Sequence, residues 1–113
     1  MKIHRVVFRE VDRDKYNEVV KGLKIIETRA ATIKFRDIAA GDKLKFVCGK
    51  DAFEKSIASV KYYSSIDEML AELPYKKILP SAKNQEDVYK IYWSFPGYKA
   101  KIEENGIMAF ELY

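Results

Sequence analysis

The stretch 22–30 constrains the fold more than any other part of the chain. It begins with Gly22, and glycine readily ends a helix because it enters the left-handed backbone region without steric cost. The residues around this stop have the spacing of one buried helical stripe, formed by Tyr16, Val19, Val20 and Leu23. Residues 25–30 then read as a strand, and so do residues 3–9 at the start of the chain. The first thirty residues therefore predict strand, helix, strand.

The remaining chain predicts three more strands and two more helices. We expect strands at residues 43–47, 53–63 and 107–113, and helices at residues 66–73 and 84–95, with another helical turn at 98–105. The irregular alternation in 53–63 predicts a bulge or bend. Ser65 and Asn84 are the expected helix N-caps, and Glu68 is placed to complete a capping box with Ser65.

The order of these elements predicts the fold class. Most strands lie in the first half of the chain and one returns at the end, which favours a mixed sheet that curls or closes into a small barrel. With 113 residues, the chain has the length of one domain, spanning 1–113. We therefore expect an α+β fold with about five strands and about three flanking helices.

Composition excludes several classes of protein. No apolar run reaches the ~20 residues of a membrane span, and the first residues lack the apolar core of a signal peptide. The chain has one cysteine, Cys48, and one histidine, His4, so neither an internal disulfide nor a His/Cys metal site is expected. We therefore expect a cytoplasmic protein with no metal, no cofactor and no membrane partner.

The positive charge is concentrated in one segment. Residues 21–50 hold eight Lys or Arg and three acidic residues, whereas the rest of the chain has a net charge of −1. An anionic partner such as RNA or a nucleotide would explain this bias. Lysines that keep edge strands and loops soluble would explain it equally well.

Three charged residues of the stretch 22–30 can form a binding site. Glu27 and Arg29 lie two positions apart on a strand, so both project from the same face. Arg29 can bind a phosphate or a base edge, Glu27 can accept from an exocyclic amine, and Lys24 adds a positive charge. Spacing alone also fits an exposed salt bridge that contributes less than ~1 kcal/mol.

Several motifs together resemble the ASCH domain family, which belongs to the PUA-like group of small β-barrels. The resemblance begins with Gly22-x-Lys24-x-x-Glu27-x-Arg29 and continues with the Gly41-Asp42 turn before a strand that contains Phe46. It extends through segments 60–64, 66–70 and 92–97 to the final strand segment 106–110, and so covers nearly the whole chain. The resemblance implies a PUA-like barrel with a charged cleft that binds RNA or a modified nucleoside and acts in RNA metabolism.

The same resemblance implies an alternative function. Some small bacterial members of this family are amidohydrolases that remove the acetyl group from N4-acetylcytidine with a lysine, a threonine and a glutamate. Lys24 stands at the position of that lysine, but Glu27 occupies the position of the threonine. Thr28 is one step further along the strand and faces the other way. The sequence leaves the third residue open among Glu68, Glu72 and Glu86.

Other residues complete the predicted site. Lys43 is a candidate for contacts with RNA phosphates, and Tyr63 and Trp93 are candidate stacking platforms for bases. The predicted binding set is therefore Lys24, Glu27, Arg29, Lys43, Tyr63 and Trp93, of which Lys24 and Glu27 are the candidate catalytic residues. The leading hypothesis is a domain that binds RNA, a nucleoside or a nucleotide; the alternative is an amidohydrolase with a changed catalytic set.

Overall fold

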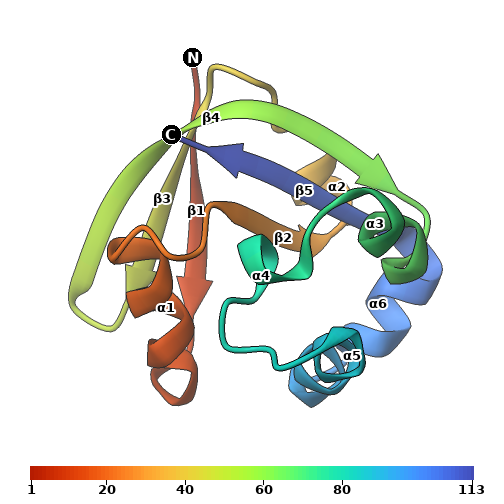
Figure 1. Cartoon of the computed structure of the whole chain (residues 1–113). Coiled ribbons are helices and arrows are strands. Elements are labelled where there is room, and N and C mark those ends of the chain that lie inside the picture. Colours follow the sequence, from red (N-terminus) through yellow and green to blue (C-terminus); the bar gives the residue numbers. More distant parts are fainter.

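A curled, five-stranded mixed sheet organises the protein (Figure 1). The computed structural model describes residues 1–113. The strands are β1 (Ile3–Phe8), β2 (Ile26–Ala30), β3 (Lys43–Cys48), β4 (Asp51–Tyr63) and β5 (Ile107–Leu112), in the order β1-β3-β4-β5-β2. Strand β1 runs parallel to β3, and the other neighbouring pairs are antiparallel. The predicted α+β class and the small curled sheet are confirmed.

Six α-helices and one 3₁₀ turn surround this sheet. They are η1 (Glu10–Asp12), α1 (Arg13–Val20), α2 (Ile33–Arg36), α3 (Ile66–Glu72), α4 (Tyr75–Ile78), α5 (Gln85–Ser94) and α6 (Tyr98–Asn105). The single-turn helices α2 and α4 were not predicted, because four residues are too few to show helical periodicity. No helix is both long and apolar enough to cross a bilayer.

Side-chain caps begin two of the helices where the sequence predicted them. The Ser65 side chain accepts a hydrogen bond from the Glu68 N–H, and Asn84 accepts one from the Asp87 N–H. The predicted return contact of the capping box, from the Glu68 side chain to Ser65, is wrong. Glu68 accepts instead from the N–H and the hydroxyl of Ser64. Both caps fix where the helical layer begins after β4.

Strand β3 follows the predicted alternation, and β4 has the predicted irregularity. Leu44, Phe46 and Cys48 are fully buried on one face of β3, and Lys43, Lys45 and Val47 alternate with them on the other face. The bulge expected in β4 is present as a register shift between Ile57 and Ser59. This irregularity lets one long strand pair with β3 at its start and with β5 at its end.

Strands β2 and β5 are buried on both faces. One face of β5 contributes Met108, Phe110 and Leu112 to the core inside the curled sheet. The other face contributes Ile107 and Ala109 to a second core beneath helices α3 to α6. The charged residue Glu27 on β2 is accordingly only 3% exposed.

The sheet does not close, and its two edges are β1 and β2. Strand β1 pairs only with β3, and β2 pairs only with β5. The edges approach each other near Phe8 and Arg29, since the Arg29 guanidinium lies 5.0 Å from the centre of the Phe8 ring. We call this open side of the sheet the seam. In Figure 1, α1 lies on one side of it and α5 and α6 lie on the other.

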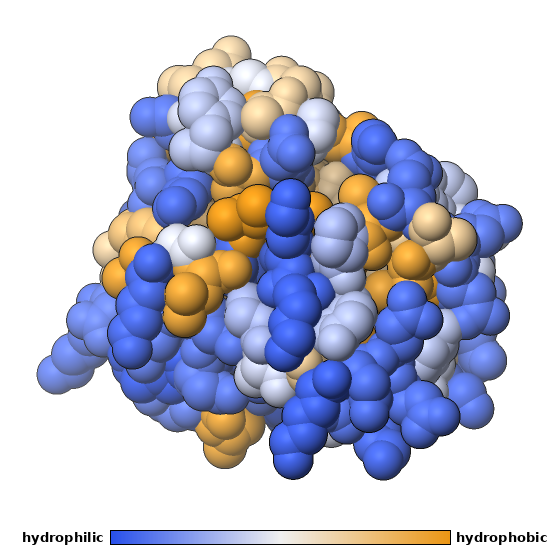
Figure 2. Space-filling model, in the orientation of Figure 1, coloured by the Kyte–Doolittle hydropathy of each residue, from blue (hydrophilic) through white to orange (hydrophobic).

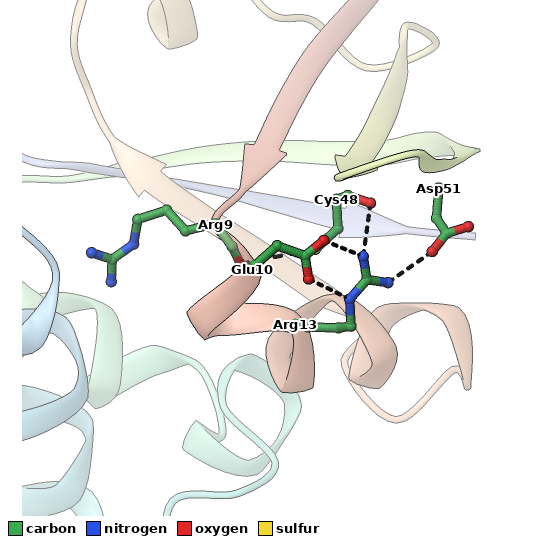
Figure 3. Close-up of polar contacts among 5 residues, drawn as sticks. All are labelled: Arg9, Glu10, Arg13, Cys48 and Asp51. Carbon is green, nitrogen blue, oxygen red and sulfur yellow. Dashed lines mark hydrogen bonds and ion pairs between the residues drawn. The ribbon is translucent and has the colours of Figure 1, made fainter.

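A polar network around Arg13 holds α1 beside the turn between β3 and β4 (Figure 3). The Arg13 guanidinium donates to both carboxylate oxygens of Glu10, to Asp51 at 2.8 Å and to the Cys48 carbonyl at 3.1 Å. Figure 3 shows the Arg9 side chain pointing away from this network. The network therefore fixes the start of α1 and leaves the Arg9 guanidinium outside it.

Candidate functional site

A cavity of about 210 Å³ lies along the seam. Its lining comes from the end of β1, from α1, from β2 and from the helical segment that includes α5 and α6. Both faces of β2 reach it, because β2 is an edge strand and the cavity runs beside its unpaired side. At ~30 Å³ per water molecule, the volume corresponds to about seven waters.

Lys24 lies at the inner part of this site and is only 3% exposed. Its ammonium group donates to the Ile78 carbonyl, and its backbone N–H donates to the Glu18 carbonyl. Burial lowers the pKa of Lys24, although the charges of Glu27 and Glu18 oppose that shift. Lys24 is thus a desolvated amine held in a fixed position.

Glu27 and Arg29 project from the same face of β2, as the strand period predicted. Glu27 Oε1 accepts from Arg29 Nε at 3.3 Å and from the Thr28 N–H at 3.2 Å. Glu27 Oε2 is buried and has no hydrogen-bond partner. The Glu27 side chain is 4% exposed, so the reading as an exposed salt bridge does not hold. An unpaired buried carboxylate oxygen is costly and needs an explanation.

Thr28 faces the helical layer, opposite to Glu27. Its hydroxyl is hydrogen-bonded to the hydroxyl of Tyr92 on α5. The Tyr98 hydroxyl on α6 accepts from the Ala30 N–H at 3.1 Å. Burial raises the pKa of both tyrosines, so they remain protonated donors. The two hydroxyls tie α5 and α6 to the unpaired side of β2.

Aromatic rings form the helical wall of the cavity. The Tyr92 and Tyr98 rings are stacked, with centroids 6.3 Å apart and planes inclined by 12°. Phe95 packs edge-on against both of them. Phe8 lines the opposite side, beneath the Arg29 guanidinium. A ligand in the cavity therefore contacts aromatic side chains next to the charged side chains of Glu27 and Arg29 on β2.

The rim of the cavity is basic. Arg9 follows β1, Lys15 lies on α1 and Lys101 lies on α6, and all three line the cavity with Asp12. The molecular face that carries α1, α4 and α5 has a band of apolar residues across its middle, interrupted by hydrophilic ones (Figure 2).

The structure brings together half of the predicted binding set. Lys24, Glu27 and Arg29 line the cavity, whereas Lys43, Tyr63 and Trp93 do not. Lys43 begins β3 beside Ile3, at the end of the strand away from the cavity. Tyr63 is buried in the core beneath the helices. Trp93 packs against Tyr89 and under the Lys99 ammonium group on the outside of α5.

None of the three candidate glutamates reaches the cavity. Glu68 accepts from Ser64, Glu72 pairs with Lys61 on the surface, and Glu86 is exposed in the first turn of α5. Glu18 is also outside the cavity lining, but its buried Oε1 has no partner and its charge acts on Lys24, and sequence reasoning missed it. Sequence spacing offers a signal for Glu18, because it precedes the Gly22 helix stop by one helical turn.

Two solved structures resemble this chain over nearly its whole length. The crystal structure of hypothetical protein PH0355 has 28% sequence identity and a TM-score of 0.82, and the match covers 99% of this chain and 97% of that chain. The solution NMR structure of protein PF0455 from Pyrococcus furiosus has 27% identity and a TM-score of 0.73, and the match covers 99% and 96% of the two chains. No family model matches the chain, and no curated protein matches it significantly. The fold and the site define a small half-barrel domain with a charged cavity at its open seam.

Proposed function

We propose that this chain is an ASCH-like domain of the PUA-like group that binds a nucleoside, or an unpaired base of RNA, in the seam cavity. The observation that supports this most directly is the unpaired Oε2 of buried Glu27. A bound donor group would satisfy this oxygen, and the exocyclic amine of a base is such a donor.

The surroundings of Glu27 fit a flat ligand. Base stacking on aromatic side chains contributes roughly 1–3 kcal/mol per base. Tyr98 and Phe95 place aromatic rings on one side of the cavity, and on the other side the Arg29 guanidinium covers the Phe8 ring. Because the Tyr98 oxygen accepts from the Ala30 N–H, its own O–H remains free to donate to a ligand acceptor.

A nucleoside and short-RNA binding screen tests this proposal. Chemical-shift perturbation in the ¹⁵N-labelled protein should map ligand contacts to β2, the end of β1 and α6. The Glu27→Ala variant should lose most of this binding, while Glu111→Ala, an exposed carboxylate on β5, should retain it. Shifts that fall outside the cavity, or equal binding by the two variants, would contradict the proposal.

The second candidate function is hydrolysis of an N4-acylated cytidine-like nucleoside. The observation that favours it is that Lys24 and Glu27 lie buried in the same site, where the charge of Glu27 favours the ammonium form of Lys24. Glu27 would take a proton from the attacking water, and Lys24 would stabilise the oxyanion of the tetrahedral intermediate. Glu27 would then return the proton to N4 as the bond between N4 and the acyl carbon breaks, which releases a neutral amine and a carboxylic acid. Thr28 is engaged with Tyr92 and takes no part in this scheme.

Turnover of N4-acetylcytidine tests this second function. Chromatography should detect cytidine and acetate with the wild-type protein and neither product with Lys24→Met. Lys77→Met is a matched control, because Lys77 is an exposed lysine on α4 outside the cavity. Absence of turnover by the wild type at high enzyme concentration would reject this substrate.

A further inference from the structure

The charges that line the seam cavity do not balance. Five cationic side chains line it, from Arg9, Lys15, Lys24, Arg29 and Lys101, against the two carboxylates of Asp12 and Glu27. Net positive charge in a confined site attracts anions and raises their local concentration. Asp14 and Glu18, which lie outside the lining, offset part of this excess, and a neutral nucleoside would leave the rest uncompensated.

We propose that the ligand carries a terminal phosphate, which binds to Arg9, Lys15 and Lys101 at the rim of the cavity. This inference rests on the proposed function and deepens it, because it assigns the site to a nucleotide or a phosphorylated RNA end in preference to a nucleoside. The shared chemistry is a phosphomonoester, which carries about −1.5 to −2 charges at neutral pH.

The rim cations have donors to spare. The Arg9 side chain is 48% exposed, and only its Nε is engaged, with Asp12 at 2.7 Å. Its two terminal nitrogens make no hydrogen bond, so both can contact phosphate oxygens. The Lys15 ammonium group has one partner, Asp14 at 2.7 Å. Lys101 lines the cavity, and its side chain makes no ion pair.

The inner cations are less suited to a phosphate. Arg29 pairs with Glu27 and lies over the Phe8 ring. Lys24 is buried and donates to the Ile78 carbonyl. The unpaired oxygen of Glu27 would repel a phosphate placed beside it. The base is therefore expected inside, at Glu27, and the phosphate outside, where basic side chains line the cavity from the residue after β1, from α1 and from α6.

Calorimetric titration with cytidine, adenosine and their 5′-monophosphates tests the phosphate subsite. At low ionic strength, the monophosphates should bind at least ~10-fold more tightly than the nucleosides, and added salt should reduce this difference. The same titration with short RNAs that carry a 5′-phosphate or a 5′-hydroxyl identifies the source of the phosphate. Tighter binding by either phosphorylated form supports the subsite.

Two variants on α6 locate the phosphate. Lys101→Ala should lower the affinity for monophosphates several-fold and leave the affinity for nucleosides unchanged. Lys99→Ala is the matched control, because Lys99 lies on the same helix over the Trp93 ring, outside the cavity. A wild type that binds both ligand forms equally, or a Lys101→Ala variant that weakens both equally, would overturn the subsite. Absence of any nucleoside or nucleotide binding would overturn the proposed function as well.

Discussion

The hydrogen bond between Thr28 and Tyr92 gives a sharp test of how α5 is attached to β2. Both side chains are buried, and each hydroxyl is the other's side-chain partner. Tyr92→Phe leaves the Thr28 hydroxyl buried without that partner, which typically costs about 1–3 kcal/mol. At about 4–8 °C per kcal/mol for a small domain, the melting temperature should fall by about 4–24 °C.

A double-mutant cycle separates this hydrogen bond from general packing effects. Thr28→Val should destabilise the protein by a similar amount, because it leaves the Tyr92 hydroxyl unpaired. The double variant, Thr28→Val with Tyr92→Phe, removes both polar groups, so its loss should be smaller than the sum of the single losses by at least ~0.5 kcal/mol. Urea denaturation of the four proteins measures these free energies. Additive losses would mean that the hydroxyls of Thr28 and Tyr92 do not interact.

Two further predictions concern parts of the fold outside the cavity. The pKa of the Asp42 carboxyl lies well below its usual value of ~3.9, because the carboxylate is hydrogen-bonded to His4 and to the backbone N–H groups of Lys2 and Ala39. These contacts should stabilise the folded protein fully above about pH 5, and the stabilisation should be lost as the pH falls and Asp42 is protonated. Urea midpoints from pH 6 to about pH 2 should therefore fall more steeply for wild type than for Asp42→Asn, and parallel curves would contradict this assignment. Gly106→Ala should destabilise the protein more than Gly22→Ala. Both glycines have positive φ, but only at Gly106 would an added Cβ lie 2.6 Å from the Tyr63 carbonyl oxygen. Equal losses by thermal denaturation would exclude that steric contact.

Much of the fold could be predicted because local patterns agree with the tertiary structure. The alternation in residues 43–47 matches the buried face of β3, and the irregular pattern before Tyr63 corresponds to the bulge in β4. Gly22 does adopt positive φ where the first helix ends. Helices α2 and α4 depend on contacts outside their own four residues, so no local pattern indicates them.

In the candidate site too, the local pattern predicted the residues of β2, whereas it did not predict the residues that distant segments contribute. The strand period correctly placed Glu27 and Arg29 on one face of β2 and Thr28 on the other. Tyr98 lies 68 positions beyond Ala30 along the chain, and it reaches the cavity only because α6 folds back along the unpaired side of β2. Sequence spacing contains no information on that return.

The predictions for Lys43, Tyr63 and Trp93 show the same limit. Residue type alone made them candidates, since lysine suits phosphates and aromatic rings suit bases. The structure places them at the far end of β3, in the core beneath the helices and on the outside of α5. Residue type is informative about chemistry, whereas membership of a site depends on which strand edges and helices meet.

In the proposed function, Glu27 recognises a donor group on a base. Calorimetry on wild type and Glu27→Gln tests this recognition with two matched pairs of ligands, cytidine with uridine and adenosine with inosine. The two members of each pair differ by the exchange of an amine for a carbonyl. A hydrogen bond to a charged group contributes about 1.5–3 kcal/mol, so wild type should prefer the amino-bearing base by about 10- to 100-fold. Glu27→Gln should lose that preference while remaining folded. Equal affinity of wild type for both members of each pair, or a preference that persists in Glu27→Gln, would contradict the claim.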